Sequence, residues 1–509
     1  MKQMKTIFKC ILKVASPIHL GCDEVYEPTC FTVDETNQRL TVFDPLAFIS
    51  SLPEEERARF SDICKRGTVQ SILEVYKFLR QKTAEGRSLS LCNGFVDHYK
   101  KILALEANEK TLLQNLNQFQ VARTAFRPVD DRPYIPGSAI KGALRTAYLN
   151  QISKTRRVPT PRGKNPGKDL EKSLLEYNPG QTETDPFRLV KVSDFQPVGA
   201  VETRIVYAVN KKKKNSDKKT KEFSIILEVI EPGAVFAGDI SVEQPLKTGV
   251  IRNPIDFDAL IKSIGEFYMR ENGREIGELK NIGITGVSVE WHENKLPLRL
   301  GRHSGAESLT VEGHRDIKIM LGKGKKPIFR DGATTFWLSS ETDKNLYDKG
   351  LRPFGWAQLE QWHPEIQAEI DLAEKDFQAE REMEQNRRRA EAEQNRREEE
   401  RLRLEAESRQ RELEKEAQEE AAKQAALAAM TPEEREIREL EDPNVAEEKI
   451  NIAFKKLDEY TPENQRAAAE IIKNYWQAQK RWTKKDFSTK QWKTAREKIA
   501  KIKSILGEE

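Results

Sequence analysis

Tyr134-Ile-Pro-Gly-Ser-Ala-Ile-Lys-Gly-Ala-Leu-Arg145 is the stretch of the sequence that says most about the fold. Pro136-Gly137 predicts a turn, and Ser138 is suited to cap a helix that starts there. The apolar residues beyond it recur at helical spacing and predict one buried face: Ile140, Ala143, Leu144, Ala147 and Tyr148. The sequence therefore predicts a turn followed by an amphipathic helix.

The opposite side of this helix carries a candidate phosphate site. It brings together the turn residue, a hydroxyl, two cations and a second glycine: Gly137, Ser138, Lys141, Gly142 and Arg145. The positive end of a helix attracts phosphate, and a glycine lets a nucleic-acid backbone approach closely. A capped helix with a solvated basic face explains the same pattern equally well, so the phosphate site is a hypothesis.

Two basic segments favour a nucleic-acid partner as well. Residues 154–168 contain six basic side chains and no acid, and residues 211–221 contain seven lysines and one acid. The second segment joins two β-rich runs and is expected at a hairpin tip, with Lys211, Lys212 and Lys213 as candidate RNA contacts. The alternative for both segments is a disordered solubilising loop.

A glycine-bounded loop is the last candidate binding element. Gly301 and Gly305 flank Arg302 and His303, a composition that suits close passage of a sugar-phosphate chain. Taken alone, this pattern also fits an ordinary surface turn. We take Gly301, Arg302 and His303 as candidate RNA contacts.

The front of the chain reads as a mixture of strands and helices. Residues 6–14 alternate between apolar and polar side chains, as a half-buried strand does. Further strands are expected at 203–209, 223–230, 286–291, 316–321 and 334–338, and helices at 69–82, 96–119 and 255–270. This order predicts an α+β or α/β fold.

Composition changes after Trp362. Residues 371–425 hold 18 acidic and 13 basic side chains without proline or glycine, which favours a lone charged helix over a weak coiled coil. Helix starts follow at Thr431-Pro432, Thr461-Pro462 and Ser488, and predict a small bundle. Residues 444–509 hold 15 basic and 10 acidic side chains. The preferred interpretation of this segment is an ordinary helical bundle with a solvent-exposed basic face. The alternative is a docking module for RNA or a protein.

Charge and cysteine content limit the class of protein. The net charge of +4 combines about +10 in residues 1–362 with −6 in residues 363–509. A basic body makes a polyanionic partner more plausible. No apolar run reaches the roughly 18 residues of a membrane span, so no membrane partner is expected. The five cysteines form no C-x-x-C pair, and we expect a reduced, cytoplasmic protein.

The usual catalytic signatures are missing from the sequence. It has no phosphate-binding Gly-x4-Gly-Lys-Ser/Thr, no His-Glu-x-x-His and no Gly-x-Ser-x-Gly. None of the six histidines stands at metal-ligand spacing from a cysteine, so neither a metal nor a cofactor is expected. His19, His303 and Asp23 are the only candidates for acid–base chemistry that we can name.

Three motifs in this order resemble the RAMP superfamily of CRISPR proteins, and most of all the fifth Csm subunit of type III-A effector complexes: Ser16–Gly21, Tyr134–Arg145 and Arg299–Gly305. The resemblance covers about residues 5–360. It implies two ferredoxin-like, RRM-related domains, at 1–200 and 201–362. The long helix at 363–430 and the bundle at 431–509 lie outside it, and their role is open.

The resemblance also implies a function. It implies an RNA-binding subunit that holds the 3′ part of the CRISPR RNA (crRNA) at the end of the effector backbone, in crRNA maturation and antiviral defence. The implied partners are crRNA, target RNA, other type III-A subunits and a possible maturation nuclease. Because no acid–base pair is visible, we expect a non-catalytic subunit. A crRNA-processing endoribonuclease, or a protein adaptor acting through the helical tail, remains the alternative.

Overall fold

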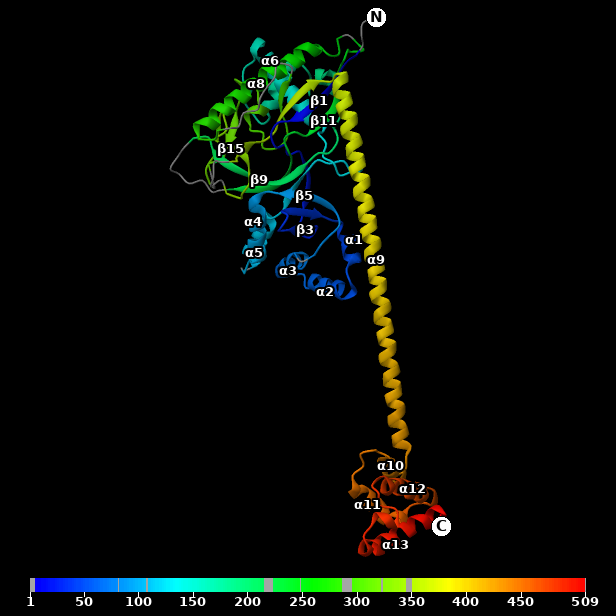
Figure 1. The fold of residues 1–509 in the computed structure, drawn as a ribbon. Coiled ribbons are helices and arrows are strands. Elements are labelled where there is room, and N and C mark those ends of the chain that lie inside the picture. Colours follow the sequence, from blue (N-terminus) through cyan, green and yellow to red (C-terminus); the bar gives the residue numbers. More distant parts are fainter. Residues whose placement is uncertain are drawn as a thin grey trace. The chain divides into compact units, whose positions relative to one another are not determined.

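The computed structural model describes residues 5–80, 82–106, 109–214, 223–247, 249–285, 295–321, 324–344 and 350–508. The chain divides into two compact units, Met1–Met383 and Glu384–Glu509. The first unit mixes sheets and helices, and the second is helical (Figure 1). The sequence-based expectation of a mixed α and β front part followed by a helical region is confirmed.

The first sheet has the strand order β12–β17–β1–β11–β7, and β8 also pairs with β11. All of these neighbours are antiparallel. Its strands are β1 (Lys5–Val14), β7 (Val190–Val192), β8 (Gln196–Pro197), β11 (Val235–Glu243), β12 (Leu296–Arg299) and β17 (Trp356–Gln361). The strand expected at 6–14 is β1, in which Leu12 and Val14 are buried and Lys9 and Lys13 are exposed.

Two helices pack against each other and against this sheet, namely α6 (Gly137–Thr155) and α8 (Phe257–Asn281) (Figure 1). The predicted stripe of α6 is buried at Ile140, Ala143, Leu144 and Ala147, and Tyr148 is half-buried. Along the chain the order is β1, α6, β7, β11, α8 and β17. The helix expected at 255–270 is α8, which continues to Asn281.

The second sheet has the order β2–β6–β10–β9–β5–β4–β3, and β15 pairs with β9 and with β16. Its strands are β2 (Gly21–Tyr26), β3 (Phe31–Asp34), β4 (Arg39–Val42), β5 (Arg87–Leu91), β6 (Val121–Thr124), β9 (Thr203–Lys212), β10 (Ser224–Ile230), β15 (Thr335–Ser340) and β16 (Arg352–Pro353). The two runs expected at 203–209 and 223–230 pair as the antiparallel strands β9 and β10.

Helices from the first hundred or so residues share a core with this second sheet. They are α1 (Pro45–Ser51), α2 (Glu54–Lys65), α3 (Val69–Leu79), α4 (Asn93–Leu103) and α5 (Glu109–Gln118). The single helix expected at 96–119 is wrong, since α4 and α5 are separate. Nine residues separate Leu103 from Leu112, about two and a half helical turns, so their buried stripes cannot lie on one face of a continuous helix.

The remaining elements are short. They are the hairpin β13 (Ile317–Ile319) and β14 (Ile328–Arg330), the helix α7 (Pro166–Leu175), and the 3-10 turns η1 (Thr182–Thr184), η2 (Pro186–Leu189), η3 (Glu307–Leu309), η4 (Leu457–Glu459) and η5 (Lys484–Asp486). The strand expected at 286–291 lies outside the described residues. Both large sheets contain strands from before and after residue 200, so that predicted boundary does not separate them.

The charged segment forms α9 (Pro364–Ala429), as expected for 371–425. Oppositely charged side chains one turn apart pair along it, for example Arg397 with Glu393 at 2.6 Å and Arg403 with Glu407 at 3.0 Å. Among the described residues, no helix has both the length and the hydropathy needed to cross a bilayer.

The helical bundle follows, with α10 (Pro432–Leu440), α11 (Glu447–Lys455), α12 (Pro462–Ala478) and α13 (Thr489–Leu506). The predicted helix starts are confirmed, and reciprocal capping boxes form between Thr431 and Glu434 and between Ser488 and Gln491. The bundle has a hydrophobic core of its own.

Candidate nucleic-acid interface

The three motifs that lie far apart in the sequence meet through backbone hydrogen bonds. The amide of Arg302 donates to the carbonyl of His19 at 2.9 Å, which joins the first motif to the glycine loop. The amide of Ala125 donates to Leu20 at 2.6 Å, and the amide of Tyr134 donates to Ala125 at 3.2 Å. One continuous set of contacts therefore connects the loop after β1, the glycine loop and the turn before α6.

The glycine loop needs its glycines for space as well as for backbone conformation. Gly301 has a φ of 80°, and a β-carbon there would collide with the carbonyl oxygen of His19. At Gly21 a β-carbon would lie 2.6 Å from Nε of Arg302. The backbone contact excludes a side chain at Gly301, whereas at Gly21 the neighbour is the flexible, exposed side chain of Arg302, which can move.

Buried charges hold the two ends of the glycine loop. Arg299 lies 2.6 Å from Glu275 of α8, and both side chains are buried. At the other end, Glu307 accepts a hydrogen bond from Lys213 at 2.5 Å. Burial disfavours the charge on Glu307, but Lys213 and Arg274 outweigh it and lower the pKa of Glu307 to about 2. The loop is therefore fixed to α8 and to the end of β9.

Arg302 is the exposed cation of this loop. Its guanidinium lies 2.7 Å from Asp23, and the two side chains are 56% and 90% exposed. An ion pair this exposed contributes little stability. Arg302 can therefore exchange Asp23 for a phosphate at small cost, and a bidentate guanidinium suits phosphate well.

The surroundings of the two histidines in these loops disfavour the protonated ring. His19 is buried, its Nδ1 lies 2.7 Å from the carbonyl oxygen of Glu228, and burial lowers its pKa. Burial, followed by the nearby charges of His19 and Arg302, lowers the pKa of His303 to about 4. A ring with such a pKa is neutral at pH 7, so it could act there as a general base but not as a general acid.

The turn before α6 differs from the prediction in one respect. The N-cap residue is Pro136, and Ser138 is an exposed residue of the first turn whose side chain makes no capping bond. Instead, the amide of Gly137 donates to the Asp194 carboxylate at 2.8 Å. The expected cap at Ser138 is wrong because an acid from the loop between β7 and β8 takes that role.

The cations of α6 have different surroundings. Arg145 lies 2.7 Å from Asp185 and 3.4 Å from Glu171, and it stacks over Phe187 at 4.5 Å. Lys141 is half-buried, and no ion-pair partner for it occurs among the residues that the structure describes. Burial, followed by the charges of Arg145 and Lys191, lowers the pKa of Lys141. Lys141 is therefore the cation of α6 best placed to receive an anion.

The two glycines of α6, Gly137 and Gly142, differ in burial and in the space around them. Gly142 is exposed, and a β-carbon there would meet nothing within 4 Å. Gly137 is buried, and a β-carbon there would lie 2.5 Å from the carbonyl oxygen of Val192. Gly137 therefore serves the packing of α6 on the first sheet, while Gly142 leaves open space beside Lys141.

The lysine-rich segment is partly built into the protein. Lys211 and Lys212 end β9 and are half-buried, and Lys213 forms a second ion pair, with Glu278 at 2.8 Å. Burial lowers the pKa of Lys211. The remaining part of the predicted hairpin tip, from 215 to 222, lies outside the described residues. Lys213 thus has a structural role that its position in a lysine run did not suggest.

The other basic segment, at 154–168, is partly helical. The helix α6 runs to Thr155 and α7 begins at Pro166, which leaves a shorter loop between them. Arg156 pairs with Glu176 at 3.1 Å, and Lys154 lies 3.5 Å from Glu266.

Sequence reasoning missed a buried network beneath the loops. Glu228 of β10 pairs with Arg87 at 2.5 Å and accepts from the hydroxyl of Tyr26 at 3.1 Å. Its backbone carbonyl contacts His19, so the network supports the first motif from below. A lone glutamate within an apolar strand was the signal for it, because a buried acid needs a partner.

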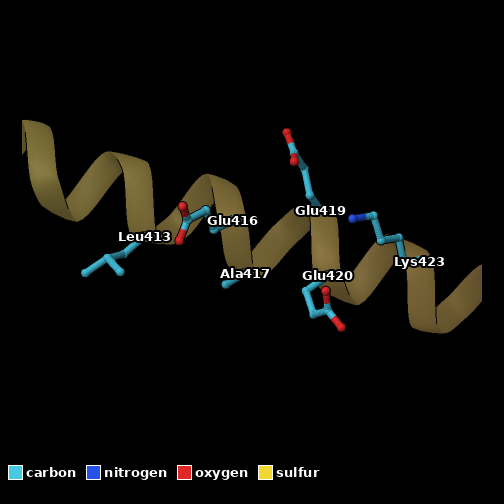
Figure 2. A pocket seen from close by; sticks show the side chains of 6 residues that line it. All are labelled: Leu413, Glu416, Ala417, Glu419, Glu420 and Lys423. Carbon is cyan, nitrogen blue, oxygen red and sulfur yellow. The ribbon is translucent and has the colours of Figure 1, made fainter.

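The described residues offer no metal site, and one surface hollow lies on α9. The described residues contain no group of three or more side chains able to hold a metal ion. Figure 2 shows a hollow whose six lining side chains all come from α9, between Leu413 and Lys423. They project from a single helix, and such a hollow lacks the enclosure that a ligand pocket needs.

Comparisons with known proteins agree with the motif pattern. A family model described as the RAMP superfamily matches residues 11–276. The chain is 26% identical over 212 residues to the CRISPR system Cms protein Csm5 of Streptococcus thermophilus, which covers 39% of this chain and 54% of that protein. The chain thus spans about half the length of this curated relative.

Two solved structures are similar to the chain at 20% identity. One is a chain of a cryo-EM structure of a Csm–crRNA–target RNA ternary complex of a type III-A CRISPR-Cas system, with a TM-score of 0.48, covering 69% of this chain and 100% of that one. The other is the crystal structure of T. onnurineus Csm5, with a TM-score of 0.40, covering 68% and 99%. The family match spans more than half of the sequence and confirms the predicted resemblance: the chain belongs to the RAMP superfamily, and it is similar to Csm5.

Proposed function

We propose that this chain is a non-catalytic, RNA-binding subunit of a type III-A CRISPR effector complex. In this proposal it holds the 3′ part of the crRNA at the end of the backbone and takes part in crRNA maturation and antiviral defence. The observation that carries the proposal is the hydrogen-bonded junction of the three motifs, through His19, Leu20, Ala125 and Tyr134. Membership of the RAMP superfamily and similarity to Csm5 support it.

The topology of the first sheet supports the expected kind of domain. The chain order of β1, α6, β7, β11, α8 and β17 is the βαββαβ order of a ferredoxin-like fold. We propose that this sheet forms one ferredoxin-like domain together with α6 and α8. The second sheet has a different strand order and offers no such support.

We propose as RNA contacts the residues that carry a cation available to a phosphate or that leave open space for the RNA backbone. Lys141, Gly142 and the neighbouring Lys191 would follow the RNA backbone beside α6, and Arg302 would contact it at the glycine loop. His303 and Gly301 would shape that loop. Arg145 would act by holding Asp185 and Phe187 in place, because its guanidinium already has partners.

Base pairing between guide and target, and not this chain, would read sequence. The proposed contacts are to phosphates, which carry no sequence information directly. The partners in this proposal are crRNA, target RNA, other type III-A subunits and a recruited maturation nuclease. A recruited nuclease fits the surroundings of His19 and His303, because burial disfavours the protonated ring that a general acid needs.

The test is to purify the chain from its host under native conditions and sequence the RNA that accompanies it. We expect crRNA, with protection extending over its 3′ part, together with other subunits of the complex. The purified chain alone should leave RNA uncut. Absence of crRNA from the purified material would refute the proposal, and specific cleavage that His19→Ala or His303→Ala abolishes would favour the endoribonuclease instead.

A further inference from the structure

We propose that the C-terminal bundle carries a second surface for single-stranded RNA, formed by residues 480–496. It comprises the loop between α12 and α13 together with the first half of α13. We call it the tail surface. The proposal does not depend on the function proposed for the first unit, because it rests on residues far outside the region that the family model matches.

The tail surface stands on a stable scaffold. The bundle buries its own core, to which its four helices and the turn η4 contribute: Ile437, Leu440, Ile450, Ala453, Leu457, Tyr460, Ala468, Ala469, Ile472, Trp476, Ile499 and Ile502. Ile499 and Ile502 fix one side of α13 against this core. The side chains on the opposite side of α13 are therefore held in place by a packed helix.

The charge of this region is strongly positive. Residues 480–503 hold ten basic and two acidic side chains, in a unit whose charge is otherwise acidic. Most of the ion pairs in the bundle lie elsewhere, while Arg481 and Lys501 pair with Glu447 and Asp458 at 2.6 Å each. Seven other cations are exposed and have no ion-pair partner among the described residues: Lys480, Lys484, Lys485, Lys490, Lys493, Arg496 and Lys498, the last of which lies over the ring of Phe454.

The one acid inside the loop is already engaged. The carboxylate of Asp486 accepts backbone hydrogen bonds from Thr483 at 2.7 Å and from Trp482 at 3.1 Å. It therefore shapes the turn η5 and is not an ion-pair partner of the neighbouring lysines in the described structure. The positive charge of the tail surface is left for an external anion.

Aromatic side chains alternate with these cations. Trp482, Phe487 and Trp492 are half-buried, so each keeps part of its ring accessible. Trp482 lies beside Trp476 with ring centres 6.4 Å apart, and Phe487 beside Trp492 at 5.9 Å. Proteins that bind single strands combine cations along the backbone with aromatic rings on which bases stack. The three rings also pack against the core of the bundle, so it is their accessible parts that we propose as the platform for bases.

The cations of α13 form a stripe. At 3.6 residues per turn, Lys490, Lys493 and Arg496 span an arc of about 120°, whose middle lies about 150° around the helix from the middle of the buried pair Ile499 and Ile502. A single strand can follow such a stripe and stack its unpaired bases on the adjacent rings. A duplex keeps its bases in its own stack, so the tail surface should prefer single strands.

The experiment uses the full-length chain with four neutralising substitutions, Lys484→Gln, Lys485→Gln, Lys490→Gln and Lys493→Gln. A matched control removes the same charge from α9, with Arg409→Gln, Arg411→Gln, Lys415→Gln and Lys423→Gln. All eight side chains are exposed, so both variants should fold, and circular dichroism checks this. The probes are a labelled single-stranded RNA of mixed sequence and the same strand annealed to its complement.

In the variant with four substitutions in the tail surface, the slope of log affinity against log salt for the single strand should fall by roughly 0.7 for each phosphate that the protein no longer neutralises. In the α9 control this slope should not change. Ultraviolet cross-linking should recover peptides that contain Trp482 or Trp492. The proposal would be overturned if the two variants showed the same salt dependence of RNA affinity and no cross-link fell within 480–496. This would hold even if Lys141→Ala still weakened binding. Conversely, a tail effect without any effect of Lys141→Ala would refute the contacts proposed for the first unit and leave the tail surface standing.

Discussion

Arg299 lies 2.6 Å from Glu275 inside the first unit, and 4% or less of either side chain is exposed. The indole nitrogen of Trp356 donates to the second oxygen of Glu275 at 2.7 Å. Arg299 ends β12, Glu275 belongs to α8 and Trp356 begins β17. This contact therefore fixes the start of the glycine loop, which meets the first motif through His19.

The first prediction concerns this pair. Arg299→Met should cost about 3–5 kcal/mol of unfolding free energy, because it leaves the Glu275 carboxylate buried without its cation. Adding Glu275→Gln should recover much of that loss, since the amide oxygen still accepts from Trp356. Urea denaturation measures both. Arg270→Met, which breaks an exposed pair with Glu312, is the control and should cost less than about 1 kcal/mol. Similar losses at the two sites would contradict the account.

The second prediction concerns pH. The pKa of Glu307 falls from its ordinary 4.5 to about 2 in the folded chain. A lowered carboxyl pKa stabilises the fold above the unfolded value, and that stability is lost as the pH falls toward the folded value. The free energy of unfolding should therefore drop by roughly 2–3 kcal/mol between about pH 5 and pH 2. In Glu307→Gln this part of the pH dependence should disappear; an unaltered profile would mean that Lys213 does not hold Glu307 as described.

The third prediction separates stability from binding at Gly142. Alanine there meets open space at an exposed position of α6, so Gly142→Ala should raise the unfolding free energy by about 1 kcal/mol. If an RNA backbone passes beside Lys141, the same methyl group should weaken RNA binding. The comparison is Gly301→Ala, which should destabilise the loop because of its positive φ and the contact with His19. A more stable Gly142→Ala protein with unchanged RNA affinity would remove Gly142 from the interface.

The fourth prediction concerns α9. A peptide of residues 365–430 should be helical by circular dichroism at low salt and should lose helicity as salt rises. Pairs such as Arg401 with Glu405, at 2.7 Å, each contribute only ~0.2–0.5 kcal/mol and are screened by ions. Sedimentation should give a monomer mass. A dimer mass with concentration-dependent helicity would make the helix a coiled coil and an oligomerisation device.

Local features of this protein could be predicted from the sequence alone. The alternation of β1 and the capping boxes of the tail depend on residues within a few positions of each other, and both are confirmed. The break between α4 and α5 was missed, although the change of phase between Leu103 and Leu112 is a local signal for it. The order and type of the three motifs predicted the family.

Long-range partners could not be predicted. The cap of α6 comes from Asp194, 57 residues beyond Gly137, so no local pattern could assign it and the prediction of Ser138 was wrong. Arg145 and Lys213 look like solvent-facing cations in the sequence. Their carboxylate partners, Asp185 and Glu307, become neighbours only when the sheets assemble. Which cation stays available for RNA is therefore a property of the fold.

The most direct test of the central claim, that RNA follows α6 beside the junction of the three motifs, is a salt titration of RNA binding by Lys141→Ala with Lys191→Ala. Lys65→Ala with Lys77→Ala removes the same charge from exposed positions on α2 and α3 and serves as the control. The account predicts that the slope of log affinity against log salt falls by roughly 1.4 in the first variant and does not change in the control. An unchanged slope in both variants, with both proteins folded, would contradict it.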